Sequence, residues 1–105
     1  EFKSFDVFDD ESLALVLERA RWFSLTGGLE LFRQGDPPDS VYFVLSGRLI
    51  VVRRDSFGEE VVGYVRAGEP VGEMSLLAGE ARSASVYALR DTELLAFDRA
   101  DADWL

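Results

Sequence analysis

Short runs of branched and aromatic residues, separated by turns rich in glycine, recur along most of the chain. The runs are residues 29–33, 41–45, 49–53, 60–65, 86–89 and 94–97. Such residues suit the pleated surface of a sheet, and short strands at this regular spacing are typical of antiparallel sandwiches and rolls. In the run 41–45, Val41, Phe43 and Leu45 share one side and Tyr42 and Val44 the other. The pattern predicts a mainly β chain folded as an antiparallel jelly roll.

The two ends of the chain carry helix signals that flank these strands. Three acidic residues at positions 9–11 precede apolar residues at helical spacing, namely Leu13, Val16, Leu17 and Ala20. Acidic residues favour a helix start, so residues 10–21 are predicted to form an amphipathic helix. The next two residues, Trp22 and Phe23, are interpreted as core. After the last run, Asp98 or Asp101 is suited to cap a second helix.

Residues 72–86, called the cassette below, interrupt the strand pattern with a sequence suited to anion binding. Gly72 and Glu73 open a short helical stretch that Gly79 ends, and Arg82 with three small residues leads into the next strand. Glycine lets a ligand approach the backbone, a helix start presents free N–H groups, and a guanidinium binds two phosphate oxygens as a fork. Glu73 would repel a phosphate, so it should face a neutral donor such as a sugar hydroxyl. An anion and a hydroxyl on one small molecule suggest a nucleotide.

The cassette resembles the phosphate-binding cassette of the cyclic nucleotide-binding domain family, which reads roughly Phe-Gly-Glu-Leu-Ala-Leu, a variable run, and Pro-Arg-Ala-Ala-Thr-Val. The residues that match are Gly72, Glu73, Leu76, Arg82, Ala84 and Val86. The resemblance implies that Arg82 holds the cyclic phosphate and Glu73 the ribose 2′-hydroxyl. The implied ligand-binding set is Val71, Gly72, Glu73, Met74, Ser75, Leu76, Arg82, Ser83, Ala84 and Val86. Two positions depart from the pattern, Val71 for an aromatic residue and Ala81 for proline, and we expect altered affinity.

The resemblance extends over nearly the whole chain, through residues 31–36, 40–47 and 92–97. It implies a single cyclic nucleotide-binding domain over residues 1–105, with an N-terminal helix and a short cassette helix. It also implies a C-terminal helix that begins after Phe97 and is cut off before the long helix that closes over the base in this family. We therefore expect the chain to be a piece of a larger protein.

The composition excludes several classes of function. The net charge is −9 at a pI near 4.4, which opposes direct binding of DNA or RNA. No apolar run reaches the roughly 18 residues of a membrane span, and we expect no membrane contact and a cytoplasmic location. The chain has no cysteine and no histidine. Without histidine the usual general base, catalytic triad and most transition-metal sites are lost, which also disfavours an enzyme of the cupin type. No cofactor and no catalytic residue are expected.

The sequence thus favours a regulatory module that binds a cyclic nucleotide without changing it and controls an attached effector domain. Ser83 is compatible with either base, since its hydroxyl can accept from the exocyclic amine of a syn guanine, and cAMP is preferred over cGMP. The runs 71–74 and 89–95 resemble those of modules that precede patatin-like phospholipase domains in bacterial relatives of neuropathy target esterase. The alternative is a domain that has kept the fold but binds no nucleotide and serves as a protein-docking module.

Overall fold

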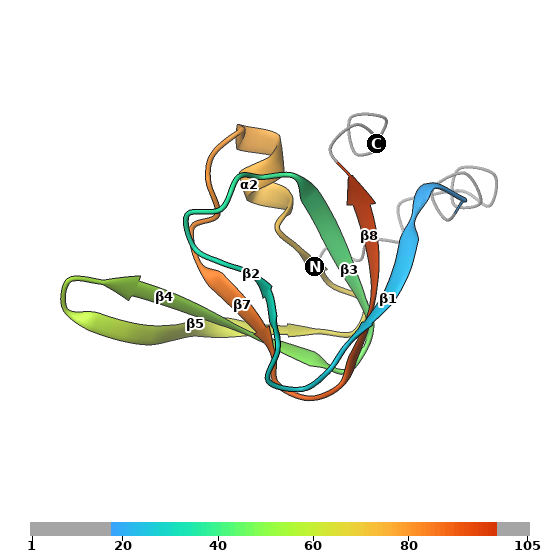
Figure 1. The fold of residues 1–105 in the computed structure, drawn as a ribbon, viewed down its shortest axis with the longest axis horizontal. Coiled ribbons are helices and arrows are strands. Elements are labelled where there is room, and N and C mark those ends of the chain that lie inside the picture. The colour runs from blue at the N-terminus through green and yellow to red at the C-terminus, as the bar shows by residue number, and fades with distance from the viewer. Residues whose placement is uncertain (1–17, 99–105) are drawn as a thin grey trace.

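Two antiparallel sheets make up the molecule in a computed structural model, which describes residues 18–98 (Figure 1). The strands are β1 (Arg21–Leu25), β2 (Glu30–Phe32), β3 (Ser40–Ser46), β4 (Arg48–Asp55), β5 (Gly58–Arg66), β6 (Pro70–Val71), β7 (Ser85–Ala88) and β8 (Thr92–Asp98). One four-stranded sheet has the order β1-β8-β3-β6 and the other β2-β7-β4-β5. Strands distant in sequence are neighbours in both sheets. This is the predicted jelly roll.

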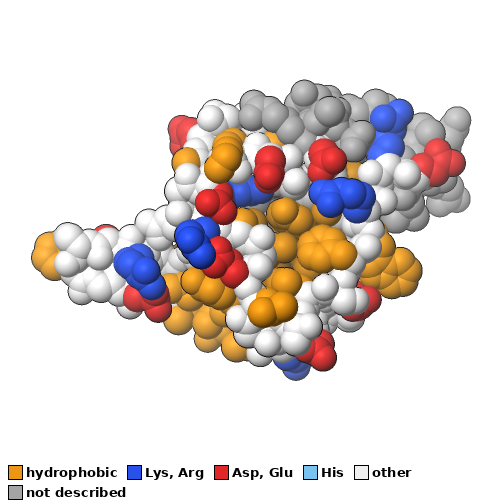
Figure 2. Space-filling model, in the orientation of Figure 1, with side chains coloured by type: hydrophobic (Ala, Val, Ile, Leu, Met, Phe, Trp, Pro, Cys, Tyr) orange, Lys and Arg blue, Asp and Glu red, His pale blue; other side chains and the backbone are white. Residues whose placement is uncertain are grey.

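The hairpin formed by β4 and β5 is the longest pair and projects away from the rest of the molecule (Figure 1). Its register runs from Arg48 opposite Arg66 to Asp55 opposite Gly58, with a bulge at Val51 and Val52. Figure 2 shows hydrophobic side chains over the middle of one face and at the tip of the hairpin, where Phe57 is 98% exposed. The base of the hairpin belongs to the core, whereas its tip contributes nothing to it.

The core consists of two clusters on opposite faces of the sheet that contains β3. The inner cluster lies between the two sheets and contains Val44, Leu49, Val65, Val71, Val86, Ala88 and Leu94. The outer cluster contains Val41, Phe43, Leu76, Leu95 and Phe97. Because side chains alternate along a strand, β3 supplies both clusters, with Val41 and Phe43 on one face and Tyr42 and Val44 on the other. The predicted alternation is confirmed for residues 41–44, whereas Leu45 is 37% exposed and belongs to neither cluster, at a register shift between Val44 and Ser46.

The start of the described chain differs from the sequence prediction. Of the helix predicted over residues 10–21, the structure describes only residues 18–21; residues 18–19 are helical and β1 begins at Arg21. Residues 10–17 and the predicted C-terminal helix lie outside the described residues. Phe23 packs against the inner cluster as expected. The interpretation of Trp22 as core is wrong, because the side chain is 69% exposed and its Nε1 donates to Glu93 Oε1 at 3.2 Å. Within residues 18–98, no helix has the length and apolar character needed to cross a membrane.

Candidate functional site

The cassette helix α2 (Glu73–Ala78) separates the short strand β6 from β7. It begins after Gly72 and ends at Gly79, both in the left-handed region, with φ of 87° and 70°. The amide of Gly79 donates to the carbonyl of Ser75, which caps the last turn. The helical stretch read from the sequence is therefore confirmed at both ends. The chain leaves one sheet after β6 and enters the other sheet at Ser85, where β7 begins.

A cavity of about 400 Å³ lies beside this helix and is called the cassette cavity. From the cassette and the residue before it, the lining residues are Val71, Gly72, Glu73, Met74, Ser75, Ser83, Ala84 and Val86. Apolar side chains complete the lining and are called the apolar wall below; they are Phe32, Val51, Val62, Val65 and Pro70. Cavities of this size commonly hold small molecules. The structure brings together all of the predicted ligand-binding residues except Leu76 and Arg82.

Leu76 lies on the side of α2 that faces away from the cassette cavity. Its side chain is 8% exposed and packs with Phe43 and Phe97 in the outer cluster. The resemblance to the family had implied that Leu76 belongs to the ligand-binding set. The packing of the helix on β3 decides otherwise. The structure therefore assigns Leu76 to the core, as a residue that anchors the helix.

Arg82 is buried directly behind Gly72, at 2% exposure. Its Nη1 donates to the carbonyl of Gly72 at 2.9 Å, and its Nη2 donates to the carbonyl of Ser40 at 2.6 Å. Asp39 lies 3.4 Å from Nη2, and the ring of Phe32 stacks on the guanidinium at 4.2 Å from its centroid. These contacts hold the charge of Arg82 at the edge of the cassette cavity instead of within its lining.

Gly72 makes this placement of the guanidinium possible. A Cβ at position 72 would come within 2.5 Å of Arg82 Nη1, closer than side chains pack in proteins. The φ of 87° is also one that residues other than glycine rarely adopt. Glycine thus satisfies two requirements at once, the backbone turn into α2 and the close approach of the arginine.

Two buried polar atoms of the cassette have no hydrogen-bond partner among the described residues. They are Oε2 of Glu73 and Nε of Arg82. A carboxylate and a guanidinium on either side of Gly72 would ordinarily pair with each other, and the structure records no such pair between them. Buried polar groups are almost always satisfied, so an acceptor and a donor left without partners in one site indicate a place for a third group.

Sequence reasoning missed the apolar wall and the two residues that hold Arg82. Val51, Val62 and Val65 come from the β4–β5 hairpin, and the bulge at Val51 and Val52 determines which side of β5 faces the cavity. Asp39 and Ser40 are more than forty positions from Arg82. Alternation along a strand indicates which residues share a face, but no signal in the sequence indicated which face of β4 meets the cassette.

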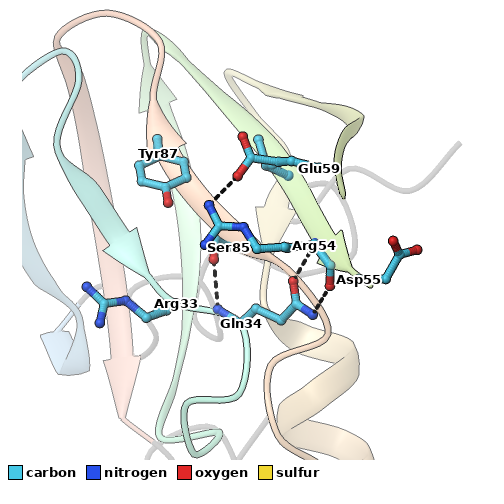
Figure 3. Close-up of a pocket in the computed structure, with 8 residues that line it drawn as sticks. Arg33, Gln34, Arg54, Asp55, Glu59, Ser85 and Tyr87 are labelled. Carbon is cyan, nitrogen blue, oxygen red and sulfur yellow. Dashed lines mark hydrogen bonds and ion pairs between the residues drawn. The ribbon is translucent and has the colours of Figure 1, made fainter. Parts of the chain in front are cut away.

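A second, open pocket of about 330 Å³ lies on the other side of the sheet that contains β4 and β5, toward the tip of their hairpin (Figure 3). Both arginines that line this pocket form ion pairs with glutamates. Arg33 donates to Glu30, and Arg54 to Glu59; these hydrogen bonds and the charges of the glutamates raise the pKa of both arginines. The ion pairs leave little free positive charge for an anion. Among residues 18–98 no group of acidic side chains is arranged to hold a metal ion.

Relatives with similar sequences are much longer proteins. Lysophospholipase nte1 from Aspergillus terreus is 40% identical over 80 residues, which is 75% of this chain and 5% of that protein. Patatin-like phospholipase domain-containing protein 7 from Rattus norvegicus is 40% identical over 74 residues, which is 70% of this chain and 6% of that protein. The chain thus spans about a twentieth of the length of these relatives. The resemblance to modules of patatin-like phospholipases is confirmed.

A solved structure and a family model both match most of the chain. The catabolite activator protein of Thermus thermophilus superposes with a TM-score of 0.87 and 37% identity, over 95% of this chain and 47% of that chain. The family model described as the cyclic nucleotide-binding domain matches residues 22–105, which contain the whole cassette and all of the strands except the first residue of β1. The chain therefore belongs to the cyclic nucleotide-binding domain family.

Proposed function

We propose that this domain binds a cyclic nucleotide in the cassette cavity and thereby controls an attached effector domain. One observation carries the proposal: Glu73 Oε2 and Arg82 Nε are both buried and unpaired within residues 18–98, on either side of Gly72. A ligand that offers a hydroxyl donor to Glu73, and an anionic acceptor at the edge of the cavity where Arg82 lies, has the chemistry that these two side chains require. A ribose 2′-hydroxyl beside a cyclic phosphate has this arrangement.

The remaining surface of the cavity suits a base. Phe32, Val51, Val62 and Val65 offer only apolar contact, which matches the face of a purine. Adenine carries fewer exocyclic hydrogen-bonding groups than guanine, so burying it against an apolar wall leaves fewer polar atoms unsatisfied. Ser83 lines the cavity and is the side chain best placed to favour guanine instead. We therefore propose cAMP as the preferred ligand.

Control of an effector follows from linkage. A ligand that binds one conformation stabilises it by RT ln(1 + [L]/Kd), about 2.7 kcal/mol at a hundredfold excess over Kd, and this free energy can shift an attached domain. The rat relative is named for a patatin-like phospholipase domain, and its matching region is a small part of its length. We propose a phospholipase of this type as the effector.

Isothermal titration calorimetry with cAMP and cGMP tests the proposal. The parent chain should bind saturably, with cAMP the tighter ligand. Glu73→Gln should weaken binding about threefold to tenfold, because it removes the charged acceptor for the hydroxyl. Glu80→Gln is the matched control, since Glu80 is an exposed glutamate just after α2 and outside the cavity lining; its affinity should equal that of the parent.

Two further results decide the outcome. Arg82→Ala should abolish measurable binding while circular dichroism still reports a folded sheet. Absence of heat with both nucleotides, from this chain and from a longer piece of the parent protein that continues past Leu105, would refute nucleotide binding. Equal affinities for cAMP and cGMP would refute only the preference.

The second candidate function is a docking module that binds no nucleotide. It is favoured by the geometry of Arg82, whose guanidinium is bonded to the carbonyls of Gly72 and Ser40 and does not line the cavity. Val71 and Ala81, which depart from the usual cassette pattern, point the same way. The titrations above separate the two functions, because a docking module would give no heat in any form of the protein.

A further inference from the structure

The side chain of Gln34 takes the place of a strand next to β4. Its Nε2 donates to the carbonyl of Arg54 at 2.8 Å, and its Oε1 accepts from the amide of Arg54 at 2.8 Å (Figure 3). These are the two bonds that facing residues exchange in an antiparallel ladder. The pairing of β7 with β4 runs from Leu49 to Val52, opposite Ala88 and Ser85, so Arg54 lies beyond its end. The side-chain amide of Gln34 therefore continues the hydrogen-bond ladder along β4, beyond the point where its pairing with β7 ends.

The backbone around Gln34 is bonded to the cassette. The backbone amide of Gln34 donates to Ser85 Oγ at 2.9 Å. The next amide, of Gly35, donates to the carbonyl of Arg82 at 2.8 Å, and the amide of Arg82 donates to the carbonyl of Asp36 at 2.9 Å. Residues 34–36 therefore form a short bridge. Gly35 and Asp36 bond the backbone of Arg82, and the side chain of Gln34 bonds β4.

This bridge joins the two walls of the cassette cavity. Ser83 and Ala84, which directly follow Arg82 in the chain, line the cassette side of the cavity, and Val51 on β4 belongs to the apolar wall. Gln34 itself lies on the other side of the sheet, in the pocket of Figure 3, and is not one of the residues described as lining the cassette cavity. A ligand that touches both walls is sensitive to their separation without touching Gln34.

We propose that Gln34 is a positioning residue, which sets the place of Arg82 relative to β4 and thereby the affinity of the cavity for nucleotide. The proposal rests on the proposed function for its effect on affinity. Its structural part, the anchoring of Arg82 through the bridge, stands independently of any ligand. The two parts are tested separately.

The first experiment follows amide hydrogen exchange by NMR without nucleotide. Gln34→Met has a similar side-chain length and loses both bonds to Arg54. Exchange should become faster at Arg54, and also at Gly35 and Arg82, whose amides belong to the bridge, while amides of β8 keep their protection. Arg33→Met is the matched control, because the guanidinium of the neighbouring residue bonds Glu30 and not β4; it should leave these amides unchanged. Faster exchange confined to Arg54 would overturn the proposal.

The second experiment is a double-mutant cycle in cAMP titrations. Gln34→Met should weaken binding roughly threefold to tenfold, the range expected when a hydrogen-bonded contact is lost. In the background of Arg82→Lys, the same substitution should have almost no further effect, since the group that it positions is gone. Equal losses in both backgrounds would show that Gln34 acts through the overall fold and would overturn the proposal. If the parent chain binds no nucleotide, the proposed function fails, and the exchange data alone decide whether Gln34 anchors Arg82.

Discussion

Substitution of Gly72 by alanine tests the central packing relation of the cassette. A left-handed backbone costs a residue with a Cβ about 1–2 kcal/mol. The new methyl group would also lie 2.5 Å from Arg82 Nη1, so the guanidinium must retreat and lose its bond to the carbonyl of Gly72. A hydrogen bond from a charged donor contributes about 1.5–3 kcal/mol. We expect Gly72→Ala to lower the free energy of unfolding by about 2.5–5 kcal/mol.

Urea and thermal unfolding followed by circular dichroism measure this loss. The unfolding temperature should fall by at least about 10 °C, because 1 kcal/mol corresponds to about 4–8 °C in a domain of this size. Gly63→Ala is the matched control, since a Cβ there meets no atom within 4 Å of the described structure and Gly63 does not have positive φ. It should gain about 0.4–1 kcal/mol by restricting the unfolded chain. A loss below about 1 kcal/mol for Gly72→Ala would refute the reasoning, because strain alone predicts that much.

Three further substitutions separate the contacts around this site by unfolding measurements in urea. Asp39→Asn should change the free energy of unfolding by less than about 1 kcal/mol, because the carboxylate is 77% exposed although it faces Arg82; a larger loss would show that the pair is shielded from solvent. Phe32→Leu should lower it by roughly 1–2 kcal/mol through loss of the ring that stacks on the guanidinium, and no change would exclude that contact. Phe57→Ser should leave it within about 0.5 kcal/mol of the parent, and any clear loss would mean that the hairpin tip is covered.

The fold class was predictable because the strands carry a local signal. Branched and aromatic residues alternate between turns, and β3, β4, β5, β7 and β8 lie close to the ranges expected from that pattern. The strand β1 was missed because it comes directly after a run of apolar residues at helical spacing, and no glycine or proline separates that run from Trp22 and Phe23. The strand β6, of two residues, is too short to show any period.

The polar part of the candidate site was also predictable, whereas its apolar part was not. Gly72, Glu73 and Arg82 lie within eleven positions of one another, and their residue types already indicate an anion and a hydroxyl. The apolar wall comes from β2, β4 and β5, and its valines look like any others in the sequence. A pattern of alternation tells which residues share a face but not what that face packs against.

Local patterns in the sequence placed every strand except β1 and β6, both limits of α2, after Gly72 and at Gly79, and the polar groups that the cassette carries. Only the tertiary structure decided that Leu76 turns into the outer cluster, that the carbonyl of Ser40 receives the guanidinium of Arg82, and that Gln34 clamps the cassette to β4. The difference lies in the sequence separation over which each kind of interaction acts. Turn chemistry and strand preference act between residues a few positions apart, whereas Arg82 and Ser40 are 42 positions apart and meet only because the two sheets pack on one core.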